Sequence, residues 1–263
     1  MGWVTEDRIM DISVIIPSFN RHNLLKWNLL SLVNQFIISD VEVIVLNDGL
    51  EDATADICYQ YKDRLNLKYI FTGQRNKIGN FIWRIPGYAI NIGVKQSSGD
   101  IIILCCAEMF HANSSIDLIT SVLHGEDADK IIAIPQGKDD NGSFLRHVEL
   151  TNGNFEMYEY DRQPKLDNVR LPFFMAMKRN AFIDIGGYDE DFTGTDFDDN
   201  DFVDRLIKNG CNHVETPAKI IHLWHNRLPM TSERKIRYDY NKKLYEERKD
   251  VIIRNAGKEW GIL

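Results

Sequence analysis

Short apolar runs alternate with segments of helical periodicity through the first half of this 263-residue chain, and this alternation limits the fold more than any other feature. Between the first two runs, Leu25, Leu29 and Leu32 recur at the spacing of one helix face. Alternating strands and helices build βα units, whose parallel strands are covered by helices. The pattern therefore predicts an α/β protein with a mostly parallel central sheet. Its first five strands are predicted at residues 12–16, 41–46, 68–71, 101–105 and 130–134.

The second half of the chain is less regular. Residues 136–170 are polar and contain several glycines, which indicates a functional loop region or an irregular hairpin without a defined element. Strands are predicted at 172–178 and 219–224, and a helix is predicted to begin near Asp199 and end at Gly210. A charged helix at 232–248 then opens a C-terminal helical extension over residues 231–263.

Charge and composition exclude several kinds of partner. The formal net charge of −8 and the scattered basic residues would repel a phosphate backbone, so no nucleic acid is expected. The longest apolar run, residues 101–107, is far shorter than the roughly 20 residues that cross a bilayer, and the N-terminus lacks a secretory pattern. Four cysteines without metal or disulfide spacing indicate reduced thiols. We expect a cytoplasmic protein without a transmembrane segment. Peripheral association with a membrane is still possible for such a protein.

Polar residues follow the predicted strands, at the edge where open α/β sheets bind ligands. Singly, each has an ordinary explanation, since Asn20 suits a helix N-cap and Asp48 suits a turn. Asp198 and Asp199 suit the positive end of a helix dipole. Five such stretches are expected at the same edge of the sheet. Structural roles alone explain this coincidence poorly, so it favours a ligand site. The places are residues 17–21, 47–49, 106–111, 198–199 and 222–225.

Four sequence blocks carry a family resemblance. They are PSFNR after the first strand, NDG after the second, GYAINIGVKQSSGDIII leading into the fourth, and IGGYDEDF followed by DDNDFVDRL. Their order and spacing resemble glycosyltransferase family 2 and its GT-A relatives over roughly residues 11–227, and the last block is similar to galactosyltransferases and chondroitin polymerases. The resemblance implies a GT-A domain at residues 1–230, with a nucleotide-binding half at about 10–135 and an acceptor-binding half at about 136–230.

The resemblance also implies the donor. Pro17, Ser18 and Asp48 match positions that hold the nucleotide, with the aspartate on the base. A buried carboxylate that accepts from a uracil N–H is selective, because a wrong base would leave it unpaired. A UDP-sugar is therefore the favoured donor, and a glycan or another hydroxyl compound is the acceptor. The remaining candidates for donor binding are Asn20, Arg75, Arg84 and Asn91.

The metal motif departs from the family pattern. Relatives carry Asp-x-Asp after the fourth strand, whereas the alignment places Cys106 at the first aspartate and Glu108 at the second. Glu108 can still hold Mn²⁺ or Mg²⁺, and a thiol is a poor magnesium ligand. The resemblance implies His225 as a further ligand, preferred over His222 because residues three apart on a strand point to opposite faces. His111 is a third candidate, although it is as easily a plain loop histidine.

The acidic block supplies the implied catalytic residues. Aligning GTDFDDND on the family pattern places Asp199 at the base of inverting enzymes and Asp198 at a position that binds substrate hydroxyls, with Thr195 in place of the usual tryptophan. In single displacement, a carboxylate takes the proton of the attacking hydroxyl while the metal stabilises the departing diphosphate. The helix N-terminus is expected to keep Asp199 ionised.

Two other functions compete with this interpretation. The incomplete Asp-x-Asp motif is compatible with a catalytically silent GT-A domain that binds nucleotide or glycan. A sugar nucleotidyltransferase would share the sheet but requires a glycine-rich phosphate loop after the first strand, which PSFNRHN lacks. Turnover of a nucleotide sugar separates the enzyme from the silent domain.

Overall fold

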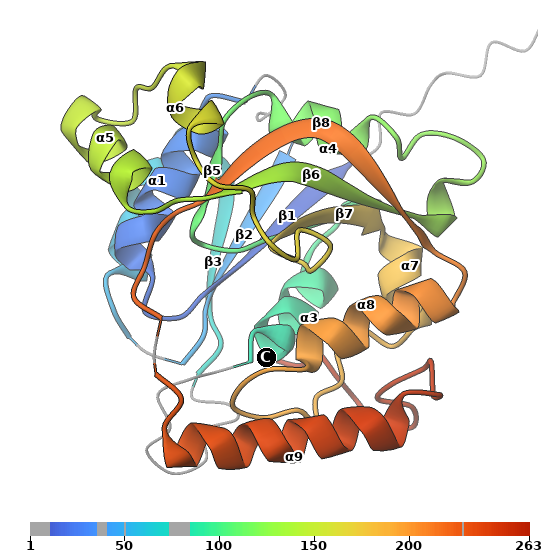
Figure 1. Ribbon diagram of the computed structural model, residues 1–263. Helices are drawn as coiled ribbons and strands as arrows, with labels where there is room; N and C mark the ends of the chain where they lie inside the picture. Colours follow the sequence, from blue (N-terminus) through green and yellow to red (C-terminus); the bar gives the residue numbers. More distant parts are fainter. Residues whose placement is uncertain (1–10, 36–40, 50, 74–84, 228) are drawn as a thin grey trace, which may run out of the picture.

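The computed structural model describes residues 11–35, 41–49, 51–73, 85–227 and 229–263, and its described part is a mixed α/β structure built on one curled sheet (Figure 1). Within these residues, no helix is long and apolar enough to cross a membrane. The strand order is β3-β2-β1-β4-β7-β6-β8-β5. The strands are β1 (Ile12–Ser18), β2 (Val41–Asn47), β3 (Asn66–Phe71), β4 (Ile101–Cys105), β5 (Met109–His111), β6 (Ile131–Asp139), β7 (Phe174–Lys178) and β8 (Asn212–His222).

Helices cover both faces of the sheet (Figure 1). The described helices are α1 (His22–Val33), α2 (Thr54–Tyr61), α3 (Gly87–Gln96), α4 (Ser115–Thr120), α5 (Ser143–Thr151), α6 (Met157–Asp161), α7 (Arg179–Asp184), α8 (Asp198–Lys208) and α9 (Ser232–Arg248). Successive residues of β1 divide between two cores, because Val14 packs with α1, α2 and α4 and Ile15 packs with α3, α7 and α8. Burial on both faces explains why the strands read as continuous apolar runs.

The parallel half of the sheet confirms the predicted βα units. Strand β1 pairs in parallel with β2 and β4, and β2 pairs in parallel with β3. Strand β7 then runs antiparallel to both β4 and β6 and joins this half to the second one. The carboxyl ends of β1, β2 and β4 therefore meet at one edge, where the sequence placed its ligand residues.

The polar segment 136–170 is more ordered than its composition indicated. It completes β6 and then forms α5 and α6. The carboxylate of one residue accepts the hydrogen bonds of the backbone N–H groups at the start of α5. Asp140 accepts hydrogen bonds from the backbone N–H groups of Gly142, Phe144 and Leu145. Its Oδ2 also accepts from Trp224 N at 3.2 Å, which ties this segment to the chain after β8.

Strand β8 begins seven residues before the predicted start and ends two residues before the predicted end. It pairs in parallel with β6, and the register shifts between Ile134 and Gln136. Beyond the shift, Asp139 lies opposite His222. The short strand β5, which the sequence did not predict, pairs antiparallel with the end of β8.

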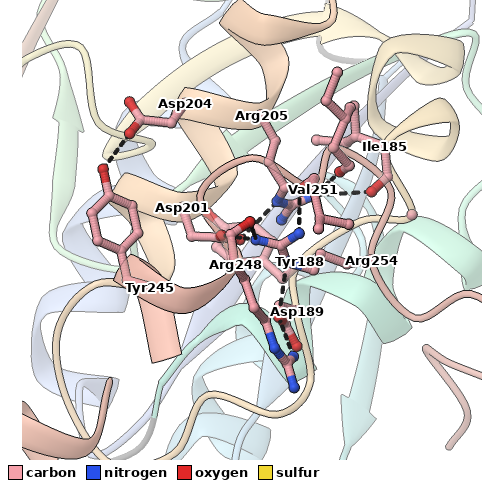
Figure 2. Close-up of polar contacts among 12 residues, drawn as sticks. Ile185, Tyr188, Asp189, Asp201, Asp204, Arg205, Tyr245, Arg248, Val251 and Arg254 are labelled. Atoms are coloured by element: carbon pink, nitrogen blue, oxygen red, sulfur yellow. Dashed lines mark hydrogen bonds and ion pairs between the residues drawn. The ribbon is translucent and has the colours of Figure 1, made fainter. Parts of the chain in front are cut away.

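The C-terminal extension packs against α8 as part of the same structure (Figure 1). Helix α9 has the predicted bounds, and the segment after it buries Arg254 beside α8. The Arg254 guanidinium donates to Asp201 at 2.6 Å and lies 2.9 Å from Asp189, while Arg205 donates to the other oxygen of Asp201 at 2.7 Å (Figure 2). These buried ion pairs tie residues 231–263 to the helix that carries Asp199.

Helix α9 also fixes the acidic loop that precedes α8. Asn241 is fully buried, and its Nδ2 donates toward the carbonyl oxygens of Thr193, Thr195 and Asp196. We expect Asn241→Ala to lower the free energy of unfolding by about 2 kcal/mol, because buried carbonyls would lose their donor. Chemical denaturation measures the change, with Lys242→Ala on the exposed side of the helix as the control. Equal stability of the two variants would contradict this role.

Candidate functional site

A tight turn after β4 presents Glu108 to the end of β8. The backbone N–H of Met109 donates to the Cys106 carbonyl, which closes the turn between β4 and β5. Leu223 N then donates to the Glu108 carbonyl at 2.8 Å. The Glu108 side chain therefore lies beside the two histidines that flank Leu223.

Glu108, His222 and His225 form a compact group of metal-ligating atoms. One ligand atom from each residue lies within 4.8 Å of the other two. The Nε2 atom of His222 is 3.9 Å from Glu108 Oε1, and the Nε2 atom of His225 is 3.6 Å from the same oxygen. Each of the three side chains is at least four-fifths buried, and the two histidines line a cavity of about 400 Å³.

Hydrogen bonds to the opposite ring nitrogens orient both histidines. His222 Nδ1 is 2.8 Å from Asp139 Oδ1, so this nitrogen donates its proton to the carboxylate and Nε2 faces Glu108. His225 Nδ1 is 3.1 Å from the Asn226 carbonyl and 3.3 Å from Arg21, so two neighbours hold this ring nitrogen and leave Nε2 toward Glu108. Both Nε2 atoms therefore face Glu108, in positions from which the rings could coordinate a cation.

The electrostatics of the group suit a cation. Burial of Glu108 opposes its charge, but the positive charges of a protonated His222, of His225 and of Arg21 outweigh burial and lower the pKa of Glu108 to about 2. Although burial opposes it, Glu108 and Asp139 raise the pKa of His222, so without an ion its Nε2 carries a proton that a cation would replace. Burial also lowers the pKa of His225, which favours a neutral imidazole. One carboxylate and two imidazoles match the ligand preferences of Mn²⁺ better than those of Mg²⁺. The residues present therefore fit a divalent transition-metal ion.

The structure corrects the predicted ligand set in two respects. His111 does not join the group, because its Nδ1 is 2.6 Å from Ser115 Oγ and its buried ring packs against Phe174. Burial lowers the pKa of His111 to about 3, so the ring is a neutral core residue. His222, which the strand argument set aside, does join the group. Strand β8 ends at His222, so the alternation of faces does not extend to His225.

Asp198 and Asp199 begin α8, as predicted, after two residues with left-handed backbone, Asp196 and Phe197. The helix N-terminus does not hold the pKa of Asp199 low, although the carboxylate stays mostly ionised at neutral pH. Burial raises the pKa of Asp199 to about 6, and the hydrogen bond from Tyr188 at 3.0 Å only partly offsets it. Burial and the neighbouring Asp199 raise the pKa of Asp198 still further. A carboxylate with a pKa near neutrality is a stronger proton acceptor.

The thiol of Cys106 connects the two acidic centres. Its pKa is raised well above the usual range, first by burial and then by the charges of Glu108 and Asp199. Both carboxylates raise the pKa of this one thiol, so Cys106 lies within electrostatic range of the Glu108 group and of the start of α8. Cys106 Sγ lies 3.9 Å from the Pro172 carbonyl, and Cys106 is absent from the group of ligand atoms.

The predicted nucleotide residues lie at the ends of β1 and β2. Ser18 is buried with its Oγ 3.4 Å from Thr54 Oγ1, while Pro17 is partly exposed and Asn20 is exposed with a left-handed backbone. Asp48 is 2 % exposed and accepts a hydrogen bond of 2.6 Å from Thr72. The site therefore holds a buried carboxylate beside the end of β1, as the base contact requires.

The other predicted donor-binding residues have different outcomes. Asn91 is fully buried, accepts from Tyr188 N and donates to Tyr188 O and Glu190, so its amide serves the packing of α3 and not a nucleotide. Arg75 and Arg84 lie outside the described residues. The sequence placed Arg21 in the candidate stretch 17–21 but gave it no role, and its guanidinium lies 4.0 Å from Glu108 and 3.3 Å from His225. Its place directly after PSFN was the available signal.

Comparison with known families places two models on the chain. The model described as glycosyl transferase family 2 matches residues 13–186. The model described as the N-terminal domain of galactosyltransferase matches residues 173–227. The two matches overlap and together cover the described sheet, the Glu108 group and the start of α8.

Curated relatives match over most of this chain. Chondroitin synthase of Escherichia coli is 25% identical over an alignment of 248 residues that covers 79% of this chain and 35% of the relative. Validoxylamine A glucosyltransferase of Streptomyces hygroscopicus subsp. jinggangensis is 27% identical over an alignment of 228 residues that covers 76% of this chain and 52% of the relative. The chain thus spans between about a third and a half of the length of these two proteins.

Solved structures share the fold. Staphylococcus aureus TarS residues 1–349 in complex with UDP-GlcNAc superimposes with a TM-score of 0.60 at 17% identity, over 94% of this chain and 69% of that chain. The mannosyltransferase PcManGT of Pyrobaculum calidifontis, in complex with GDP-Man and Mn²⁺, gives 0.56 at 16% identity, over 89% of this chain and 62% of that chain. The sheet and its flanking helices are those of the GT-A fold.

Proposed function

Because the chain belongs to glycosyl transferase family 2, we propose that it transfers a hexosyl group from a UDP-sugar to an acceptor hydroxyl with inversion at the anomeric carbon. The observation that carries this proposal is the Glu108 group, whose ligand atoms lie within 4.8 Å of one another, together with the buried carboxylate of Asp199 at the start of α8. Displacement at a sugar carbon needs stabilisation of a leaving diphosphate and a base for the attacking hydroxyl. The two centres can supply these two requirements.

Glu108, His222 and His225 would hold the metal ion, with Mn²⁺ preferred over Mg²⁺. Such an ion supplies positive charge that neutralises a leaving diphosphate. Asp139 orients His222 through its Nδ1–H, and Arg21 contributes a fixed positive charge beside Glu108. A metal-bound relative of the same fold supports the choice of ion.

Asp199 would accept the proton of the acceptor hydroxyl. Its raised pKa of about 6 makes it a stronger base than an exposed aspartate, and it is still mostly ionised at neutral pH. Asp198, whose buried Oδ2 has no hydrogen-bond partner among the described residues, would contact a substrate hydroxyl. A glycan acceptor is favoured by the chondroitin synthase relative.

UDP is the favoured carrier because Asp48 supplies a buried carboxylate at the end of β2, and TarS of the same fold has been solved with UDP and UDP-GlcNAc. We expect UDP to bind and Asp48→Ala to weaken it by about tenfold or more, since a charge-assisted hydrogen bond to the base is lost. Calorimetry measures both affinities. Unchanged affinity in a folded Asp48→Ala protein would remove the base contact.

A panel of nucleotide sugars, incubated with Mn²⁺ and assayed for hydrolysis, tests the proposed function as a whole. We expect turnover of at least one UDP-sugar, and the preferred donor names the sugar. Binding of UDP without turnover of any donor, even with glycan acceptors added, would instead support a catalytically silent domain. Activity with GDP-sugars alone would overturn the choice of UDP.

A further inference from the structure

Tyr188 holds the side chain of Asp199 from within the core. Its ring is fully buried, and its hydroxyl donates to Asp199 Oδ1 at 3.0 Å. Among the described residues, this hydroxyl is the single side-chain donor to Asp199. We propose that Tyr188 is a positioning residue that orients the Asp199 carboxylate toward the acceptor side of the site. The inference rests on the proposed role of Asp199 as the base.

The tyrosine ring is locked against the helix that carries the carboxylate. Tyr188 stacks on Phe202 with ring centroids 4.3 Å apart and an interplanar angle of 4°. Phe202 and Asp199 are three residues apart on α8, and residues at this spacing share one helix face. The hydroxyl and the carboxylate therefore belong to one rigid unit, in which the ring position sets the carboxylate rotamer.

The backbone of Tyr188 is held from two other parts of the chain. On α3, Asn91 Oδ1 accepts from Tyr188 N at 2.8 Å, and Asn91 Nδ2 donates to Tyr188 O at 2.9 Å. From the C-terminal segment, Asn255 Nδ2 donates to the same carbonyl at 2.7 Å. This double hold explains why Asn91 is buried without any nucleotide contact.

The surroundings leave the ring little freedom to move. A Cβ atom on Gly87 would lie 2.7 Å from Tyr188 Cδ1, so α3 passes directly along the ring. Gly187, with φ of 65°, has no room for a side chain either, because its Cβ would lie 2.5 Å from Asn91 Oδ1. A tyrosine placed this tightly can define a direction for the group that it contacts.

The charges around Asp199 give the hydroxyl a second effect. Asp196 and burial raise the pKa of Asp199, whereas the Tyr188 hydrogen bond lowers it. Asp198 and the Cys106 thiol lie in the same surroundings. Loss of the hydroxyl is therefore expected to raise the pKa of Asp199 and to let its side chain adopt other rotamers. These two consequences are measurable separately.

Tyr188→Phe keeps the stacked ring and removes only the hydroxyl, and the chain offers a matched control. Tyr245 also donates its hydroxyl to a carboxylate of α8, that of Asp204 (Figure 2). Tyr245→Phe, on α9, thus removes the same kind of donor from a carboxylate of α8 without touching Asp199. Both variants would be labelled with ¹³C at the aspartate carboxyl groups, and the Asp199 signal assigned from its absence in Asp199→Asn.

We expect Asp199 to titrate about one pH unit higher in Tyr188→Phe than in the native protein and unchanged in Tyr245→Phe. With the donor identified by the hydrolysis panel, kcat of Tyr188→Phe should be lower by about tenfold above pH 8, where Asp199 is ionised in every variant, with KM unchanged. Equal Asp199 titrations in the two variants, or a native kcat for Tyr188→Phe above pH 8, would overturn the inference. A native rate for Asp199→Asn would instead overturn the assignment of Asp199 as the base. The titration is measured without substrate, so its result does not depend on that assignment.

Discussion

Asp199→Asn is expected to lower the rate of sugar transfer by about a hundredfold or more while the protein stays folded and binds UDP. The substitution keeps the size of the side chain and most of its ability to accept a hydrogen bond from Tyr188, but it removes the proton acceptor. A positioned general base contributes on this order to a rate. Steady-state transfer measures kcat, and calorimetry with UDP confirms the nucleotide site.

The pH dependence of kcat should follow Asp199. Its pKa is raised to about 6, and the base acts only when ionised, so kcat should fall as the pH drops through about 6 and level off above 7. NMR of the product should show an anomeric configuration opposite to that of the donor. Asp198→Asn is the matched neighbour and should change KM more than kcat. Retention of configuration, or native transfer by Asp199→Asn, would refute the mechanism and leave the fold intact.

Loss of the metal ion is expected to have the largest effect on transfer, a decrease of about a thousandfold or more. Both excess EDTA and Glu108→Ala should produce it, since a leaving diphosphate would lose several kcal/mol of charge stabilisation. Restoring Mn²⁺ should recover the EDTA-treated enzyme better than Mg²⁺ does, because two of the three ligands are imidazoles.

Direct Mn²⁺ binding, measured by electron paramagnetic resonance, separates this site from other causes of inactivity. His222→Ala and His225→Ala should each weaken Mn²⁺ binding, whereas His213→Ala, on the same strand as His222 but outside the group, should not. Full activity in excess EDTA would mean that cationic side chains such as Arg21 stabilise the diphosphate.

Elements with a strong local signal were predicted from the sequence. Strand β4 has the predicted bounds because five consecutive apolar residues are buried on both faces. Helix α9 also has its predicted bounds, since its charged sequence is preceded by Thr231, whose side chain accepts from the N–H of Arg234. In both cases the residues that define the element are neighbours in sequence.

Segment 136–170 shows where local signals end. Helices α5 and α6 have nine and five residues, too short for a clear periodic pattern. Their stability comes from partners elsewhere in the chain. Phe144 packs edge to face with Phe110 and Phe155, and Asp140 joins the start of α5 to Trp224. These contacts were not readable from the segment itself.

The candidate site divides in the same way. Glu108, His225 and Asp199 were found from the family pattern, because their spacing within each motif is fixed. The role of His222 depends on where β8 ends. The role of Asn91 depends on contacts with a loop almost a hundred residues away. The raised pKa of Asp199 likewise follows from burial, which is a property of the whole fold.

The register shift between β6 and β8 sets which imidazole faces which carboxylate. Between the paired positions on either side of it, β6 advances from Ile134 to Gln136 while β8 advances from Glu215 to Lys219. Two additional residues keep the alternation of faces in phase, so that Asp139 meets His222. Deleting one residue there would turn His222 to the other face and separate it from Asp139. The length of this irregularity therefore determines whether His222 can lie between Asp139 and Glu108.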